Sequence, residues 1–517
     1  MSGIKKLAGQ TLWYGVSSIA ARFIGYLLVP LLTYSEYVTP ADFGRQSLLY
    51  SAIPVLSILF TYGFETAYFR FSAIEVYKKT IYSTSFFSIV ISTILLSGLL
   101  WIFRVPFSAM IGFADIPQIA IITIGIIAID TLNKIPFAKL RQEERPIKYA
   151  FVNIAGIFVN LLLTWFFINY CPRTLAANPN SWTGNFFSFS TNPIVYVVLA
   201  NLIQSAITLL LLSKEILSVR LTFDIKLWKE MMVYALPLLI VGFGGIINET
   251  FDRLMLKAWL PGSDVFKNEQ VGIYNACYKL SILITLFVQA FRMGAEPFFF
   301  KQAAGQEPQK IYARVLKFFV LVLSVMFLVV SLFLPIWSYL IGPAYRSAIG
   351  IVPILLLANI FLGIYYNLSI WFKLSNKTTA GSTITLIGTA ITILLNFIFI
   401  PYFGFIASAW ATFFCYGTMM LISYNWGQKV YPVPYPAKKI TAYLVISALV
   451  FLLHKGVCIF VLDFWWQTIS GAALLISYLL FVARIEKNEL QKLFVWQKTY
   501  ILLAAANKKN TLLLQRK

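Results

Sequence analysis

A few ionisable residues lie inside long apolar stretches of this chain. Arg22 lies about midway along the apolar stretch 11–34, and Lys279 lies within the stretch 270–291. A charge at bilayer depth costs roughly 2.5–3.5 kcal/mol, so such residues usually face a protein interior or a wet cavity. A guanidinium can bind a phosphate through two hydrogen bonds, which makes Arg22 a candidate phosphate ligand. The alternatives are an Arg22 paired for packing and a Lys279 whose stem extends to the membrane surface.

A second group of charges lies in the segment 248–253. Glu249, Asp252 and Arg253 are spaced i, i+3 and i+4, which places them on one helix face. This group suits either a cation-coupling site or a structural ion pair. Asp130 and Lys134, spaced i and i+4, leave the same two alternatives open. The candidate substrate-contacting residues are therefore Arg22, Lys279 and Arg253, and the candidate ion-coupling residues are Glu249, Asp252 and Asp130.

The amino-acid composition indicates which kind of protein carries these charges. Of 517 residues, 59% are hydrophobic and only 12% are charged, with a mean hydropathy of +0.77. Soluble domains carry about 25% charged residues, so this composition indicates an integral membrane protein and excludes most soluble enzymes and nucleic-acid readers. All spans are expected to be α-helices, since lipid leaves unpaired backbone groups unsatisfied. Fourteen spans are predicted: 11–34, 45–64, 80–103, 118–133, 149–170, 193–213, 230–250, 270–291, 318–337, 348–372, 379–400, 403–425, 440–454 and 456–483.

The net charge of +22 comes from basic residues whose distribution predicts the orientation of the chain in the membrane. With the N-terminus inside, the inner segments carry 32 Lys and Arg residues and the outer connections carry eight, the other two being Arg22 and Lys279. This asymmetry is what the positive-inside rule expects, so nucleic acid is not needed to explain the charge. We expect a multi-pass protein with both termini cytoplasmic. The basic tail 484–517 is expected to form an amphipathic helix on the inner membrane surface.

Several chemistries are absent from the sequence. A GxxxxGK[ST] phosphate loop is missing, and no predicted connection is long enough to hold a catalytic domain. The four cysteines are widely spaced and form no CxxC pair. They are therefore interpreted as small core residues, and neither a metal site nor a cofactor is expected.

An internal repeat divides the predicted spans. The first copy runs from Tyr14-Gly15 through an apolar helix to Gly44 and Tyr50, and the second runs from Tyr234-Ala235 to Gly272 and Tyr278, 228 positions further on. Both copies begin with a helix of the same direction, so the halves are expected to be related by an axis along the membrane normal. Parallel repeats of this kind place a substrate site between the halves. The predicted domains are 1–229 and 230–428 with six helices each, two additional helices in 429–483, and the tail 484–517.

Several short segments of the two repeat copies resemble the sequence motifs of a known family. The segment Pro30-Leu31-Leu32-Thr33, followed by Thr39-Pro40-Ala41-Asp42-Phe43-Gly44, resembles the opening signature of polysaccharide biosynthesis flippases in the multidrug, oligosaccharidyl-lipid and polysaccharide exporter superfamily. The second half resembles it again at Asp252-Arg253, Val271-Gly272-Ile273-Tyr274 and Glu296-Pro297-Phe298. The resemblance extends over essentially the whole chain.

The resemblance implies a transporter rather than an enzyme. Its expected activity is translocation of an undecaprenyl-pyrophosphate-linked oligosaccharide across a bacterial cytoplasmic membrane, by alternating access of two six-helix lobes. The implied partners are the lipid-linked oligosaccharide, membrane lipids, a proton or sodium gradient and polysaccharide assembly proteins. An ion-coupled multidrug exporter of the same fold is the main alternative, and a membrane glycosyl-transfer enzyme is a remote one. The positive charges of Arg22 and Lys279 favour an anionic head group.

Overall fold

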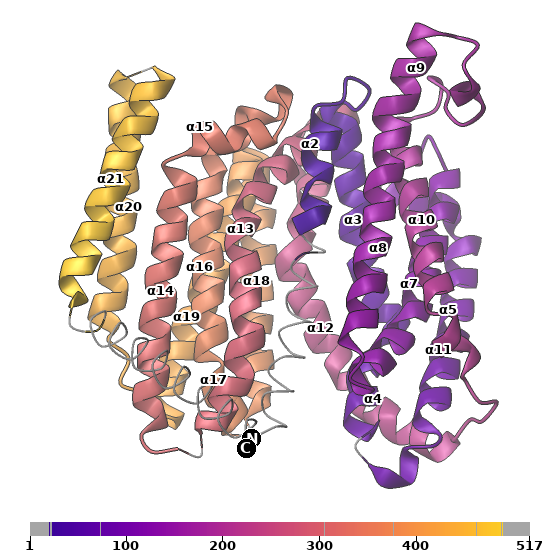
Figure 1. Ribbon diagram of the computed structural model, residues 1–517, viewed down its shortest axis with the longest axis horizontal. Helices are drawn as coiled ribbons and strands as arrows, with labels where there is room; N and C mark the ends of the chain where they lie inside the picture. Colours follow the sequence, from indigo (N-terminus) through magenta and orange to yellow (C-terminus); the bar gives the residue numbers. More distant parts are fainter. Residues whose placement is uncertain are drawn as a thin grey trace, which may run out of the picture. The chain divides into compact units, whose positions relative to one another are not determined.

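The computed structural model describes Ala20, residues 23–72, 74–303, 305–375, 377–461 and 463–487, and Glu489. Arg22 and nearly all of the predicted amphipathic tail lie outside these residues. The described part of the chain contains helices and no β-strand (Figure 1). The helices are α2 (Leu28–Thr33), α3 (Pro40–Thr61), α4 (Phe64–Ser72), α5 (Ile81–Ile102), α6 (Arg104–Met110), α7 (Gln118–Gln142), α8 (Pro146–Trp165), α9 (Cys171–Ala177), α10 (Pro193–Leu211), α11 (Ser213–Leu217), α12 (Ile225–Trp259), α13 (Asp264–Gln302), α14 (Pro308–Ser331), α15 (Leu334–Trp337), α16 (Val352–Leu368), α17 (Ile370–Leu374), α18 (Thr378–Phe403), α19 (Phe405–Val430), α20 (Ala437–Phe460) and α21 (Phe464–Ile485).

The all-α membrane fold predicted from the sequence is confirmed, with twelve or thirteen candidate spans among the described residues against the fourteen predicted. Among the described residues, twelve helices are long and apolar enough to cross a membrane. A thirteenth span is α12, which bends by 46° between Ile225–Pro237 and Gly242–Trp259. Proline has no backbone N–H to donate, so Pro237 marks the natural place for this bend. The first predicted span, 11–34, is described only at Ala20 and from residue 23 onward.

The boundary between the last two spans was predicted in the wrong place. The sequence prediction put the break at His454–Gly456, whereas α20 continues to Phe460 and α21 begins at Phe464. His454 is tolerated inside the helix because it is buried and its Nε2 lies 3.0 Å from the Gln467 carbonyl oxygen. The true N-cap is Asp463, whose carboxylate accepts hydrogen bonds from the backbone N–H groups of the first turn of α21.

The segment before α3 caps the start of this helix. Thr39 and Asp42 form a capping box, in which each side chain accepts a hydrogen bond from the other residue's backbone N–H at 3.2 Å. Pro40 occupies the first helical position, where its missing N–H costs nothing. Asn192 also donates to the Asp42 carboxylate at 2.8 Å, which ties the loop before α10 to the start of α3.

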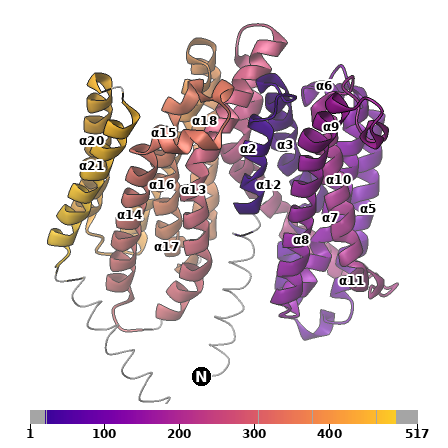
Figure 2. The ribbon, with the colours of Figure 1, turned by 45° about the horizontal axis from the view of Figure 1, so that its top comes forward.

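The described residues divide into two compact units. One contains the chain up to Leu316 together with Ile336–Tyr435, and the other contains Lys317–Pro335 and the chain from Pro436 onward. In the first unit, α5, α7, α8 and α10 pack as one group (Figure 2). The helices α12, α13, α16, α18 and α19 pack as another, and α3 packs along both α12 and α13. In the second unit, α20 and α21 run side by side.

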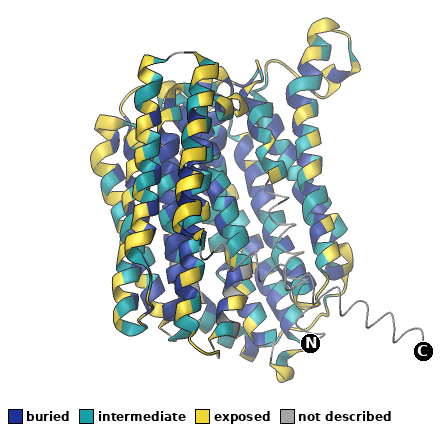
Figure 3. Cartoon of the chain, turned by 60° about the vertical axis from the view of Figure 1, so that its left-hand side comes forward, coloured by how far each residue is buried: buried dark blue, intermediate teal, exposed yellow. Residues whose placement is uncertain are grey.

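Burial separates core helices from helices with large exposed faces. In α13, 72% of the most apolar window is buried, against 17% in each of α20 and α21. Figure 3 shows exposed faces along many of the helices, with buried residues on their opposite sides. Exposed residues on these faces are mostly large and apolar, such as Ile94, Leu95 and Phe460. Lipid rather than water suits such faces.

The buried residue Glu215 links its own helix, α11, to α5 and α8 in the group formed by α5, α7, α8 and α10. Glu215 in α11 is 3% exposed, and its side chain accepts from Lys148 at 2.6 Å and from Arg145 at 2.9 Å. The Tyr82 hydroxyl donates to the backbone oxygen of Glu215 at 2.7 Å. The bonds join α5, α8 and α11 at the point where the chain leaves the first half of the repeat.

The two repeat glycines meet. Gly44 in α3 and Gly272 in α13 lie so close that a Cβ on Gly44 would be 2.9 Å from the Gly272 nitrogen and 1.7 Å from the Asn268 oxygen. A Cβ on Gly272 would be 2.1 Å from the Pro40 oxygen. Equivalent positions of two repeats touch each other only near the axis that relates them. The contact therefore agrees with the predicted pseudo-twofold arrangement.

Candidate functional site

One face of α13 lines two neighbouring cavities. The residues on this face recur at heptad spacing, as expected for one stripe of a helix. They are Asn275, Tyr278, Ile282, Thr285, Gln289 and Arg292. The stripe begins at Asn275, three residues after Gly272, and runs toward the C-terminal end of α13.

The first cavity lies between the two halves of the repeat and has a volume of about 340 Å³. We call it the central cavity. The first half contributes polar groups to it from Tyr50, Asn160 and Asn201. The second half contributes Lys279 from α13 and Arg253 from α12. Tyr50 and Tyr278, the tyrosines of the sequence repeat, both line this cavity.

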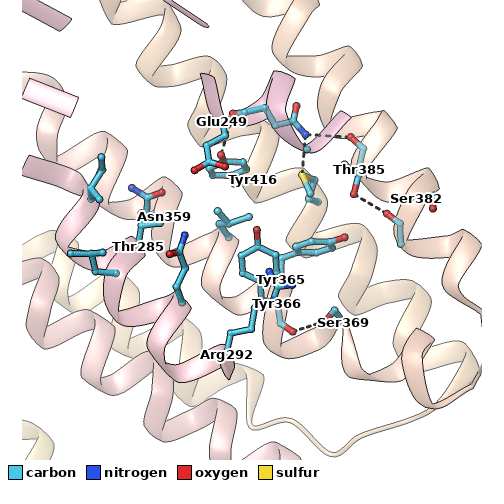
Figure 4. A pocket seen from close by; sticks show the side chains of 18 of the residues that line it. Glu249, Thr285, Arg292, Asn359, Tyr365, Tyr366, Ser369, Ser382, Thr385 and Tyr416 are labelled. Atoms are coloured by element: carbon cyan, nitrogen blue, oxygen red, sulfur yellow. Dashed lines mark hydrogen bonds between the residues drawn. The ribbon is translucent and has the colours of Figure 1, made fainter. Parts of the chain in front are cut away.

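The second cavity lies within the second half and has a volume of about 690 Å³. We call it the second-half cavity. Figure 4 shows Tyr365, Tyr366 and Tyr416 among its lining side chains, with Glu249 and Arg292 on opposite sides of the view. Its other polar lining residues are Asn248, Thr285, Gln289, Asn359, Ser369, Lys373, Ser382 and Thr385. Amide, hydroxyl and aromatic groups are the usual partners of sugar rings and hydroxyls, because they combine hydrogen bonding with flat apolar faces.

The two cavities share a wall. The residues that line both of them are Tyr26, Glu249, Tyr278 and Ile282. Glu249 is exposed to this space, and its carboxylate has no hydrogen-bond or ion-pair partner within the described parts of the chain. Lys279 is half-buried in the central cavity and likewise has no such partner among the residues described. Both charges are therefore available to a ligand.

Arg253 and Asp252 are held differently. Both are about 5% exposed, and the Arg253 Nη1 donates to the Asp252 carboxylate and to the Glu249 carbonyl oxygen at 2.9 and 2.8 Å. The Tyr274 hydroxyl donates to the second Asp252 oxygen at 2.5 Å. The Arg253 guanidinium also lies over the Tyr278 ring, 4.2 Å from its centroid. The sequence spacing placed all three charges on one face, yet Asp252 lines neither cavity and instead neutralises Arg253.

Asp130 lies apart from the other candidates. It is half-buried in α7 and lines neither of the two cavities. Asp130 and Lys134 are both described, and no ion pair within 4.0 Å joins them. The local helix-pair alternative is therefore not realised for Asp130. Arg22, the candidate phosphate ligand, lies outside the described residues.

Several lining residues were not predicted from the sequence. They include Arg292, Tyr366, Asn359 and Lys373. These residues lie near the ends of predicted spans or in apolar stretches, and nothing in the sequence marks them as facing a cavity. A signal did exist on α13, since the polar residues Thr285, Gln289 and Arg292 continue the heptad stripe of Tyr278. Polar residues at regular helical spacing inside an apolar stretch indicate a face that avoids lipid.

The two halves are in contact at the end where α3 and α13 begin. Besides the Gly44–Gly272 contact, the backbone N–H of Gly342 donates to the Thr33 hydroxyl at 3.0 Å. The Tyr345 hydroxyl donates to the Val38 carbonyl oxygen at 3.3 Å. These contacts join the two halves of the repeat at this end.

Known structures share this arrangement of helices. "Lipid II flippase MurJ, inward closed conformation" matches with a TM-score of 0.71 and 15% identity, over 92% of this chain and 99% of that chain. An inward-facing multidrug resistance MATE family transporter of the MOP superfamily matches with a TM-score of 0.57 and 14% identity, over 84% and 95%. The Vibrio cholerae MATE transporter VcmN in the bent form matches with a TM-score of 0.52 and 13% identity, over 83% and 98%. At these identities the similarity establishes the fold. No curated protein matches the sequence.

The fold is thus that of the multidrug and lipid flippase transporters. The family described as "Polysaccharide biosynthesis protein" matches residues 7–303, more than half of the chain, and the protein belongs to this family. Family and fold together confirm the predicted superfamily and the expectation of a transporter rather than an enzyme. They also confirm a multi-pass integral membrane protein.

Proposed function

We propose that this protein translocates an undecaprenyl-pyrophosphate-linked oligosaccharide across the bacterial cytoplasmic membrane for surface polysaccharide biosynthesis. The observation that carries the proposal is Lys279, a cation without a described partner, facing a cavity between two halves of a polysaccharide biosynthesis protein. A lysine there attracts a pyrophosphate, whose charge is otherwise costly at membrane depth. Arg253 also lines the central cavity, but its charge is paired with Asp252. Arg22 is proposed as a further phosphate ligand on sequence grounds.

The second-half cavity supports the oligosaccharide part of the proposal. It is about twice as large as the central cavity, and four residues line both cavities. Its lining of tyrosines, amides and hydroxyl groups suits a carbohydrate.

We further propose that the substrate enters from the cytoplasmic side, with both termini in the cytoplasm. By the positive-inside rule, the end where α3 and α13 begin faces outward, because the basic residues gather at the other end. The contact of the two halves at the outer end then keeps the cavities from opening outward. Alternating access requires this contact to separate so that the head group can leave.

Ion coupling is proposed at Glu249 first. Its carboxylate lies in the wall common to both cavities and lacks a described partner, so a proton or sodium ion bound there would act directly on the occupied space. Asp252 and Asp130 remain the other candidates. An ion moving through 100 mV supplies about 2.3 kcal/mol per charge, enough to bias the balance between two conformations. Replacing Glu249 with Gln is expected to remove the response of transport to an imposed gradient.

The multidrug exporter is the competing function that one observation favours. Glu249 together with the tyrosines of the second-half cavity suits an organic cation. The basic residues Lys279, Arg292 and Lys373 oppose a cationic ligand, since the lining carries only one carboxylate among the described residues. Polysaccharide assembly proteins are proposed as partners of the flippase, on the resemblance alone.

Export in cells separates these functions. Lys279→Gln is expected to abolish surface glycan in a strain that depends on this protein, while the variant still accumulates in the membrane. Lys267→Gln on the same helix is the matched control, because Lys267 lines neither cavity. Normal surface glycan with Lys279→Gln, or drug sensitivity without a glycan defect, would overturn the proposal.

A further inference from the structure

Two basic residues of α13 line the cavities at widely separated points of the helix. Lys279 lies in the central cavity and Arg292 in the second-half cavity, thirteen residues further along the same helix. At 1.5 Å per residue this separation is about 20 Å along the helix axis. A single pyrophosphate is far too short to contact both cations at once. The two cations therefore define two distinct points of positive charge.

The Arg292 point is built by two helical segments. The Arg292 guanidinium lies over the Tyr366 ring, 4.6 Å from its centroid. Tyr366, Ser369 and Lys373 follow at helical spacing across the break between α16 and α17, and all three line the same cavity. The ring orients the guanidinium plane, and Arg292 lines the cavity together with Tyr366. Lys373 adds a second positive charge to the same wall.

The lining between the two points is neutral. Its polar members are hydroxyl and amide groups, including Thr285, Gln289 and Asn359, and apolar residues such as Ile282 and Leu286 lie beside them. The one carboxylate of the described lining, Glu249, shares its wall with Tyr278, fourteen residues before Arg292. It therefore lies toward the Lys279 end of the stripe. The positive-inside rule explains the sign of charges at the cytoplasmic end, yet it does not require them to face a cavity.

We propose that the transported glycan carries its own anionic group, and that Arg292 and Lys373 bind this group in the second-half cavity. The group is a carboxylate or a phosphate substituent on a sugar, since both match the paired donors of a guanidinium. This inference rests on the proposed function and specifies its substrate. With the pyrophosphate at Lys279, the acidic sugar lies along the stripe at the distance of Arg292. A glycan without charge would offer no anion to this part of the cavity.

Binding to the full-length protein in nanodiscs tests the proposal. Four probes are compared by calorimetry: an oligosaccharide of hexuronic acids, the corresponding neutral oligosaccharide, the neutral one bearing a phosphate monoester, and inorganic pyrophosphate. The wild type is expected to bind at least one acidic oligosaccharide about tenfold more tightly than the neutral one, because a hydrogen bond to a charged group is worth that factor or more. Whichever acidic probe binds identifies the substituent as carboxylate or phosphate.

Variants assign the binding to the two points. Arg292→Gln is expected to lower the affinity for the acidic oligosaccharide about tenfold and to leave that for pyrophosphate within twofold. Lys279→Gln is expected to do the reverse. Arg220→Gln is the control for a general loss of positive charge, because Arg220 is exposed and lines neither cavity. A monodisperse size-exclusion profile for each variant excludes misfolding.

The outcomes separate the two proposals. Equal affinity for acidic and neutral oligosaccharides, or an acidic preference that survives Arg292→Gln, would overturn the second anionic site alone. Loss of pyrophosphate binding in Arg292→Gln would also overturn it, because Arg292 would then belong to the pyrophosphate path. Absence of pyrophosphate binding in the wild type, with acidic oligosaccharide binding intact, would contradict the proposed function and leave the Arg292 site standing.

Discussion

Gly44 controls how closely the two halves approach each other. A methyl group added at Gly44 would lie 1.7 Å from the Asn268 carbonyl oxygen, whereas ordinary van der Waals contact begins at 3.4 Å. The obstacle is backbone, so no side-chain rotation relieves it, and the two helices must separate. Overpacking of this kind costs about 1–3 kcal/mol, and a rigid contact belongs at the upper end of that range. A cost of about 2–3 kcal/mol changes the ratio of closed to open molecules by roughly 30- to 150-fold.

Spin labels measure this separation directly. In a Cys458→Ser background, Glu36→Cys and Val265→Cys place labels at exposed positions of the first and second half near this contact. Cys171, Cys277 and Cys415 are buried and are not expected to react. Gly44→Ala is expected to shift the distance distribution to longer values and to slow transport, because the closed state becomes rare.

Gly98→Ala is the matched control, since a Cβ at Gly98 meets nothing within 4 Å. It should leave both the distances and transport as they are in the unmodified protein. If Gly44→Ala gave the same distance distribution as Gly98→Ala, the contact of α3 with α13 would not hold the closed state, and the reasoning would be wrong.

Three further predictions concern stability and orientation. Asp252→Asn should lower the free energy of unfolding by about 3–5 kcal/mol, because it leaves the buried Arg253 charge uncompensated, and a thermal shift assay would show a small effect if the pair were dispensable. Burial alone would raise the pKa of Glu215, but a hydrogen-bonded lysine and a nearby arginine outweigh it and hold that pKa below the usual 4.5. The stabilising contribution of the ionised Glu215 is therefore present above pH 4.5 and is lost as the pH falls through the lowered pKa. Glu215→Gln should lower the Tm at pH 7 and make the Tm depend less on pH in acid. An unchanged Tm at pH 7 would contradict this. In the Cys458→Ser background, Asn180→Cys should react with an impermeant maleimide in intact cells and Lys226→Cys only after permeabilisation, and the opposite pattern would invert the proposed orientation.

The sequence predicted much of this fold because the membrane makes span length and charge asymmetry informative. The repeat of Gly44 and Tyr50 at Gly272 and Tyr278 even indicated the axis, since the two glycines touch in the structure. Helix ends were less predictable. His454 looked like the end of a span, and only the distant partner Gln467 explains why the helix continues through it.

The site was only partly predictable because the spacing of residues in a sequence does not show their burial or their distant partners. Lys279 stood out because a charge inside an apolar stretch is costly wherever the helix lies. Asp252 also stood out, but its role in neutralising Arg253 depends on the Tyr274 hydroxyl and on burial that spacing cannot show. Arg292 directly follows the predicted span 270–291, where basic residues are common, so its place in a cavity is evident only from the packing of α13 against α16.

Translocation by the purified protein shows directly whether it moves a lipid-linked oligosaccharide. Proteoliposomes would contain an undecaprenyl-pyrophosphate-linked oligosaccharide, and an impermeant glycosidase outside would report how fast the head group reaches the outer leaflet. The wild type and Lys267→Gln are expected to expose the glycan at equal rates, and Lys279→Gln is expected to match protein-free liposomes. Exposure by Lys279→Gln at the wild-type rate, or no exposure by the wild type under any imposed ion gradient, would contradict the account of this protein as a flippase that binds the pyrophosphate in its central cavity.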